Sequence, residues 1–260
     1  MPRTLGVSQI INKNYHTLPF TGRWAESFGQ PSDPFHMLAY GHPKNGKTTM
    51  MMGFAKYLAS NFGKVFYSSI EEGDTKTTQD AMVREAMHEI PDGRFMLGDQ
   101  YFFADLVEYL KGQNRGKFIF IDSRDYMKLT AQQYIKLVTL FPRKSFIIIC
   151  WEQAGKPAGK FAKDIEYMVD IVVHVHDFKA KCRSRFGGNQ DFVIWDKKPR
   201  VGDQLKLDQP KYDKDYNDRD DDDDEFEACS ECDGHDACVD FGCAVKAGLG
   251  HLVKSNGLTS

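Results

Sequence analysis

Long apolar runs are missing from this 260-residue sequence. No stretch reaches the roughly 18 to 20 consecutive apolar residues that a membrane-spanning helix needs, and the N-terminus lacks the apolar run of a secretory signal. Cysteine is scarce as well, since only Cys150 and Cys182 occur before residue 229. These absences predict a soluble, cytoplasmic protein with no membrane partner. In such a reducing compartment, the four cysteines that cluster near the C-terminus suggest metal binding before disulfides.

The acidic residues are unevenly distributed. Residues 213–227 contain ten acidic and two basic residues, a local charge of −8; because the whole chain carries −3, the remainder carries +5. The mildly basic body permits a polyanionic partner without requiring one. The acidic run includes five aspartates at 220–224, which repel one another. It predicts a disordered linker, with a contact to a basic protein partner as the alternative.

Short apolar segments alternate with helical patterns through the middle of the chain. This alternation predicts an α/β fold with a mostly parallel central sheet that helices cover on both faces. Strand patterns occupy residues 35–40, 64–70, 117–122, 145–151 and 168–176, with an antiparallel edge strand at 191–195, and helical patterns occupy 47–62, 75–89, 102–113 and 131–141.

Changes in composition divide the chain into four parts. We expect an irregular N-terminal lead-in at 1–34, packed on a core at 35–200. An acidic linker at 201–227 and a Cys/His-rich tail at 228–260 follow the core.

A phosphate-binding motif lies between the first predicted strand and the first predicted helix of the core. The segment 41–48 matches G-x-x-x-x-G-K-[ST] without a mismatch. Glycines let the backbone turn tightly, so that N–H groups and the helix N-terminus surround the phosphates. Lys47 supplies a charge for the β- and γ-phosphates, and the Thr48 hydroxyl is a magnesium ligand. The motif predicts ATP with Mg²⁺ as cofactors, held by Gly41, His42, Pro43, Lys44, Asn45, Gly46, Lys47, Thr48 and Thr49.

Two further strands end in acidic residues. Asp122 closes the apolar run 118–121, which is where a P-loop enzyme places the second ligand of its magnesium ion. Glu71 and Glu72 directly follow the strand pattern at 64–70. Because ligands of open α/β sheets bind at the carboxyl ends of the strands, either glutamate could orient the attacking water. The alternative is that both are solvated charges at the start of a loop.

With these residues, the chain resembles the RecA-like P-loop ATPases over about residues 34–196. Within that group it is most similar to the cores of the RadA/Sms repair ATPase and the DnaB-type replicative helicases. The resemblance rests on Ser69-Ile-Glu71, Ile121-Asp-Ser123, the segment 166–170 and the segment 183–187.

The resemblance implies roles for further residues. It favours Glu71 over Glu72 as the catalytic carboxylate and places Gln153 where the family has a sensor of the γ-phosphate. It also implies that Arg183 and Arg185 reach the γ-phosphate of a neighbouring subunit, and hence a homo-oligomer, either ring or filament. An ordinary basic edge of the sheet is the alternative explanation for these arginines.

Family members carry DNA-binding loops after two strands, here at 124–130 and 155–163. The second loop combines lysines with Phe161, a composition that single-stranded DNA favours, although an ordinary basic surface loop explains it nearly as well. The chain lacks the accessory domains of RadA and of the replicative helicases, and in this respect it resembles the recombinases and accessory ATPases of phages and mobile elements. The expected function is magnesium-dependent ATP hydrolysis on DNA in recombination, repair or replication.

The C-terminal tail contains five soft metal ligands in close spacing. This spacing is typical of a compact zinc knuckle that contacts a partner, but five ligands for four positions leave the ligand set open, and free thiols are the alternative. The ligands are Cys229, Cys232, His235, Cys238 and Cys243.

Two other functions remain open at this stage. A small-molecule P-loop kinase should carry a lid with arginines over the phosphates, and the sequence has no clear lid. A nucleotide-gated adaptor would use ATP to control assembly, with little hydrolysis.

Overall fold

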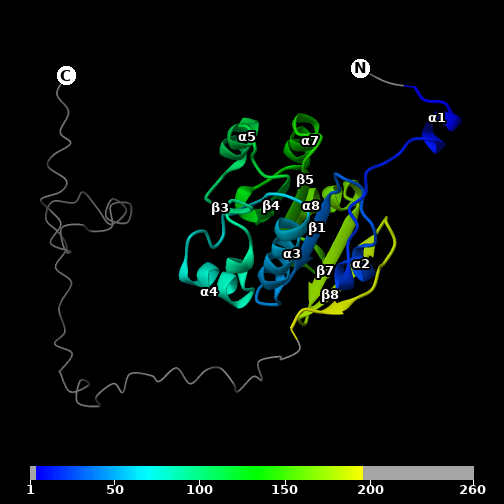
Figure 1. The fold of residues 1–260 in the computed structure, drawn as a ribbon. Helices are drawn as coiled ribbons and strands as arrows, with labels where there is room; N and C mark the ends of the chain where they lie inside the picture. The colour runs from blue at the N-terminus through cyan, green and yellow to red at the C-terminus, as the bar shows by residue number, and fades with distance from the viewer. Residues whose placement is uncertain (1–3, 196–260) are drawn as a thin grey trace, which may run out of the picture. The chain divides into compact units, whose positions relative to one another are not determined.

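A computed structural model of the chain describes residues 4–195. The predicted acidic linker and Cys/His-rich tail lie outside these residues. The described part is built around one sheet (Figure 1). Its strands are β1 (Met37–Gly41), β2 (Val65–Ser69), β3 (Phe95–Asp99), β4 (Phe118–Asp122), β5 (Ser145–Gln153), β6 (Lys156–Pro157), β7 (Ile171–His176), β8 (Lys179–Ser184) and β9 (Phe192–Val193).

The strand order is β3-β2-β4-β5-β1-β7-β8-β9, and β6 pairs with β5. The six strands from β3 to β7 in this order are parallel, whereas β8 and β9 are antiparallel. β1 lies between β5 and β7, so the strand that leads into the phosphate-binding motif is central. This arrangement confirms the predicted α/β fold class with its mostly parallel sheet.

Helices connect the parallel strands and cover both faces of the sheet, as parallel pairing requires. The long helix α3 follows β1 directly (Figure 1). The helices are α1 (Val7–Ile11), α2 (Gly22–Phe28), α3 (Lys47–Asn61), α4 (Lys76–Arg84), η1 (Met87–Glu89), α5 (Phe103–Lys111), α6 (Arg124–Met127), α7 (Ala131–Leu140) and α8 (Gly159–Met168).

Alternate residues of each central strand enter two separate cores. In β4, Phe118 and Phe120 face the core under α2 and α3, whereas Ile119 and Ile121 face the core under α5, α7 and α8. Period-two alternation with both faces apolar explains why the strands read as continuous hydrophobic runs. The two cores fix the strand ends, and with them the loops that carry polar side chains.

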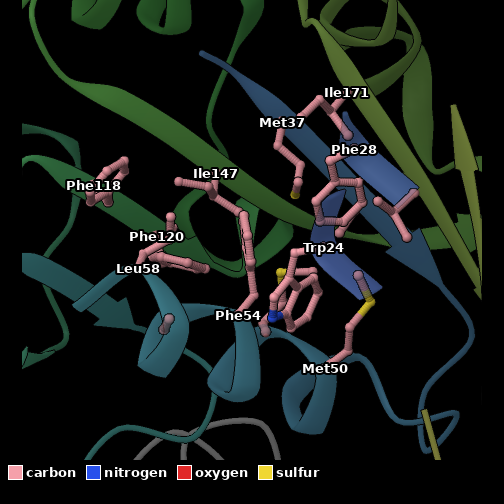
Figure 2. Close-up of a cluster of buried hydrophobic side chains, with 14 of the residues drawn as sticks. Trp24, Phe28, Met37, Met50, Phe54, Leu58, Phe118, Phe120, Ile147 and Ile171 are labelled. Atoms are coloured by element: carbon pink, nitrogen blue, oxygen red, sulfur yellow. The ribbon is translucent and has the colours of Figure 1, made fainter. Parts of the chain in front are cut away.

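The N-terminal segment belongs to the first of these cores. Trp24 and Phe28 on α2 pack against Phe54 of α3, with ring centroids 4.8 and 5.3 Å apart, respectively (Figure 2). All three side chains are buried. Residues 17–34 therefore contribute a helix and large apolar side chains to the protein interior.

Several elements differ from the sequence expectation. The helix expected over 75–89 ends at Arg84, because Ala86 has a left-handed backbone (φ 52°), and a short 3-10 turn follows. The strand β3 has no counterpart among the predicted segments. The loop expected at 155–163 contains β6 and the first turns of α8. The expected edge strand at 191–195 is present as the two-residue β9.

Candidate nucleotide site

The candidate site lies at the carboxyl edge of the sheet, where the parallel strands end. Gly41 ends β1, Asp122 ends β4, and Glu71 follows β2 by two residues. Because β2 and β4 are hydrogen-bonded neighbours in register, Ser69 lies opposite Asp122, and the two acidic segments meet. The sheet topology thus brings together residues that are 30 to 81 positions apart in sequence.

The phosphate-binding motif forms a tight loop that needs its second glycine. Gly46 is the N-cap of α3 with a left-handed backbone (φ 91°, ψ 14°), and a Cβ there would lie 3.2 Å from the ring of Phe178. The first helical bond of α3 runs from Met50 N to Gly46 O at 3.0 Å. The preceding N–H groups, those of residues 47–49, have no intrahelical acceptor, so they can bind an anion at the positive end of the helix dipole.

Lys47 rests on the loop. Its Nζ atom donates hydrogen bonds to the carbonyl oxygens of Gly41 (2.8 Å) and His42 (2.9 Å). Burial lowers the pKa of Lys47, and the carboxylates of Asp122 and Glu71 oppose this effect. When a phosphate binds, Lys47 would exchange these neutral carbonyl partners for charged phosphate oxygens. Hydrogen bonds between the ammonium group and a charged acceptor are stronger.

Asp122 is buried and has one strong partner. The hydroxyl of Tyr67 donates a hydrogen bond to Asp122 Oδ2 at 2.6 Å. Burial raises the pKa of Asp122 to about 6, although the Tyr67 hydrogen bond acts in the opposite direction. The carboxylate is thus held in place and is poorly compensated, which is the state that a cation would relieve.

Glu71 and Glu72 both line the same cavity as Lys47, which measures about 550 Å³. The Trp151 indole N–H points to Glu71 Oε2 at a long 3.5 Å. Burial raises the pKa of Glu72, and the neighbouring charge of Glu71 raises it further. Glu71 is exposed in the cavity whereas Glu72 is half-buried, so Glu71 is the carboxylate that water reaches more readily.

Two aromatic side chains from the end of the described chain also line the cavity. Phe178 and Trp195 both line it, in edge-to-face contact with their ring centroids 6.0 Å apart. Phe178 occupies the two-residue turn between β7 and β8 and has a left-handed backbone (φ 57°). A bulky residue in that region is strained, and such strain is often found where a side chain is positioned for binding. Sequence reasoning did not identify either aromatic residue.

Arg84 of α4 is a further cavity residue that the sequence did not reveal. It donates a hydrogen bond to Thr49 Oγ1 at 3.3 Å, and its guanidinium lies 5.8 Å from the centre of the Trp195 ring. Its charge also opposes the raised pKa of Glu72. The arginine therefore links the phosphate-binding end of the cavity to the aromatic end.

Three residues assigned by resemblance lie away from the cavity lining. Gln153 ends β5, is exposed and pairs with Lys156 of β6. Arg183 donates to Glu166 Oε1 (2.7 Å), and Arg185 donates to the carbonyl of Tyr167 (3.1 Å). Both arginines line a different hollow beside α8, with 70% and 60% of their side chains exposed. Within one chain they do not reach the nucleotide site.

The two segments expected to contact DNA are more ordered than open loops. Arg124 pairs with Asp125 at 2.8 Å, both side chains being nearly buried, and also donates to the Leu129 carbonyl at 3.1 Å. Within the second segment, Lys156 and Lys163 are exposed. Basic groups are thus available on the second segment, whereas Arg124 is committed to its own loop.

The donors at this edge suit a hard divalent cation held partly by phosphate. Thr48 offers a hydroxyl and Asp122 a poorly compensated carboxylate, and Mg²⁺ typically takes one or two such groups together with phosphate oxygens and water. Among residues 4–195, no three His, Cys, Asp or Glu side chains cluster closely enough to hold a metal by themselves. The proposed zinc ligands at 229–243 lie outside the described residues. Within the described part of the chain, no helix is long and apolar enough to cross a membrane.

Comparison with known proteins leaves the family of this chain open. No protein-family model matches the sequence, and no curated protein matches it. Among solved structures, the chain is similar to a KaiC-like protein from the hyperthermophilic archaeon Pyrococcus horikoshii OT3. The two share 17% identity over 62% of this chain and 83% of that one, with a TM-score of 0.48. The functional conclusion therefore depends on the residues of the site itself.

Proposed function

We propose that this protein is a magnesium-dependent ATPase of the RecA-like type. The observation that carries the proposal is that Lys47, Asp122 and Glu71 line one cavity although they come from three separate segments of the chain. Phosphate binding, metal binding and water activation need these three side-chain types next to one another.

Each residue has a defined task in this proposal. The P-loop N–H groups and Lys47 hold the β- and γ-phosphates, and Thr48 and Asp122 hold Mg²⁺. The metal, when bound, neutralises charge on the phosphates. Glu71 orients the attacking water and accepts its proton, because it is the exposed carboxylate beside the P-loop. Glu72 is half-buried, so it is the carboxylate that water reaches less readily.

The aromatic end of the cavity suits the nucleotide base. A purine stacked on Phe178 or Trp195 would gain roughly 1–3 kcal/mol, as bases do on aromatic side chains generally. The ring of Phe178 lies against Gly46, so a base held there leads directly to the phosphate loop.

We further propose that Arg183 and Arg185 complete the site of a neighbouring copy. Their exposure supports this role, as does their distance from the cavity of their own chain, because a group acting in cis would have to line that cavity. The arrangement implies a homo-oligomer in which hydrolysis occurs between subunits.

Mixing two inactive variants tests the action in trans. Glu71→Gln protein lacks the base but has both arginines, and Arg183→Ala/Arg185→Ala protein has the base but lacks the arginines. If the arginines act in trans, mixed oligomers regain ATP hydrolysis, since one subunit's arginines reach the intact cavity of the other. No recovery at any ratio, with subunit exchange verified by labelled protein, would mean that the arginines act in cis or not at all.

Nucleic acid is the polymer on which we propose the ATPase acts. The exposed Lys156 and Lys163 support contact with phosphates, and the mildly basic body of the chain permits a polyanionic partner. ATP hydrolysis measured with and without single-stranded DNA tests this part, with Lys47→Ala as the blank. A several-fold stimulation is expected, and an unchanged rate with saturating DNA would contradict it.

A further inference from the structure

A second hollow lies at the amino edge of the sheet, opposite the nucleotide cavity. Its volume is about 670 Å³. Residues that precede four strands line it: Lys64 before β2, Arg94 before β3, Lys117 before β4 and Lys144 before β5. These four strands are consecutive in the sheet, in the order β3-β2-β4-β5. The hollow is therefore a groove that crosses the strand ends.

The groove is basic throughout. None of its 14 lining residues is acidic, and six are cationic: Lys64, Arg94, Arg115, Lys117, Arg143 and Lys144. The carboxylate of Asp33, which lies outside the lining, pairs with Lys117 at 2.6 Å. The groove thus keeps a net charge of about five, in a protein whose whole charge is −3.

Two kinds of cation occur in the groove. Arg94 donates to the Ala59 carbonyl at 3.4 Å, and Lys144 Nζ donates to two carbonyls, so these side chains also support loops and a helix end. In contrast, Lys64 and Arg143 make no side-chain hydrogen bond or ion pair with any residue in the range 4–195. The donors of these two side chains are therefore available to a ligand.

The shape of the groove favours an extended polyanion. Four adjacent strands at about 4.8 Å spacing make it roughly 14 Å long, which matches about two to four phosphates at 3.4 Å or more of strand per phosphate. Phe141 lines the groove and places an aromatic side chain beside the planar guanidinium groups of Arg94, Arg115 and Arg143. Positive charge with flat stacking groups is the combination used for single strands.

We propose that this amino-edge groove binds the phosphate backbone of a single-stranded nucleic acid. The site is separate from the nucleotide cavity and from the segments 124–130 and 155–163 on the carboxyl side. Binding there requires neither ATP nor hydrolysis, because no residue of the nucleotide cavity lines the groove.

Fluorescence anisotropy with a labelled oligodeoxythymidylate tests the proposal on the full chain without nucleotide. The variant Lys64→Ala/Arg143→Ala removes the two cations that lack intramolecular partners among residues 4–195. We expect an affinity about tenfold weaker than wild type, and a salt slope smaller by about 1.4, since each lost phosphate contact on a single strand contributes about 0.7. Lys179→Ala/Lys181→Ala is the matched control, because it removes the same charge from exposed positions on β8.

A second measurement uses wild-type protein only. Bound oligonucleotide should protect Lys64, but not Lys179 or Lys181, from acetylation, with protection read by mass spectrometry. Equal affinity and slope in the groove variant, equal losses in the control variant, or no protection of Lys64 would each overturn the proposal. Tighter binding of an aspartate-rich peptide than of the oligonucleotide would overturn the assignment to nucleic acid. The Lys47→Ala protein should still bind the oligonucleotide, so failure of the ATPase proposal would not be mistaken for failure of the groove.

Discussion

The two edges of one sheet carry opposite kinds of chemistry. At the carboxyl edge, three cations and four carboxylates line one cavity, and the buried Asp122 has a pKa raised to about 6. At the amino edge, six cations line a groove without a lining carboxylate. The carboxyl edge holds charges that are incompletely compensated until a ligand arrives. At the amino edge, Arg115 and Arg143 are exposed and the other four cations are half-buried.

The two edges of this parallel sheet are suited to binding in different ways. Strand registers and cores are common to both edges, because the same strands end at both. At the carboxyl edge, charged side chains such as Asp122 are buried. Burial disfavours their charged forms, so a ligand that compensates the charge is bound selectively. At the amino edge, the number of like charges matters more than the burial of any one of them. A single hydrated cation attracts an anion weakly, but six of them together attract a polyanion strongly.

The largest effect is expected at Glu71. Glu71→Gln should lower the ATP hydrolysis rate by about 10²–10⁴-fold, because the amide cannot accept the proton of the attacking water. Nucleotide affinity should stay within a few-fold of wild type, since Glu71 makes no contact required for phosphate binding. Steady-state hydrolysis and equilibrium binding of a fluorescent ATP analogue measure the two quantities.

Glu72→Gln is the matched control for that experiment. It removes a charge one residue away and should keep most of the activity. If the Glu72 variant were the inactive one, the assignment of the base from exposure would be wrong.

The next largest effect is the pH dependence of the free energy of unfolding that Asp122 causes. Burial raises its pKa from the ordinary value of 3.8 to about 6, so the native state binds more protons than the unfolded state between these pH values. The free energy of unfolding therefore falls as pH rises through this window, by up to about 3 kcal/mol. Asp122→Asn should remove this slope and make the ligand-free protein more stable at pH 8, because the amide oxygen can still accept the Tyr67 hydrogen bond.

Urea unfolding at pH 4 and pH 8 tests the sign. The variant should gain stability over wild type at pH 8 and lose that advantage at pH 4, where wild-type Asp122 is already protonated. The same variant should lose magnesium-dependent nucleotide binding. A variant less stable than wild type at pH 8 would show that the carboxylate is well compensated in the folded protein.

The sequence was sufficient to predict those elements around the site that depend only on neighbouring residues. The P-loop, the strand that ends at Asp122 and the helix α3 all combine a motif with an apolar period, and the structure contains them. The strand β3 was not predicted, because its burial is partial and it includes Gly98, so no clear apolar alternation marks it. The helix α8 was not predicted because Pro157 and Gly159 are residue types typical of loops, although Pro157 ends β6 and Gly159 begins α8.

The remaining features depend on the sheet order. Phe178 and Trp195 lie more than 100 residues beyond the P-loop, and only the pairing of β7, β8 and β9 brings them to the cavity. The amino-edge cations are scattered between Lys64 and Lys144 in four loops, with no spacing that connects them. A single sequence gives no signal for contacts of this kind, since each depends on which strands are neighbours.

A smaller effect is expected at Phe178, where strain and function compete. Phe178→Gly removes the unfavourable left-handed backbone of a bulky residue but also removes the aromatic face, so the free energy of unfolding should change by less than about 1 kcal/mol. ATP affinity should fall about tenfold, within the range of base stacking. Lys128→Gly, which relieves a similar backbone (φ 52°) outside the cavity, is the control. Unchanged ATP affinity in the Phe178 variant would contradict the proposal that the base of ATP stacks at the aromatic end of the cavity.

The smallest effect on stability is expected for the two amino-edge cations that we propose bind a ligand. Lys64→Ala/Arg143→Ala should change the free energy of unfolding by no more than about 0.5 kcal/mol per site, because neither side chain has a hydrogen-bonding or ion-pair partner among residues 4–195. Lys144→Ala should cost more, about 1–3 kcal/mol, since it leaves the carbonyls of Arg115 and Gly116 without their donor. Chemical unfolding of the two variants measures the difference. Equal and large losses in both would mean that the amino-edge cations serve the fold, as helix-end partners do, and would remove the reason to distinguish this edge as a binding surface.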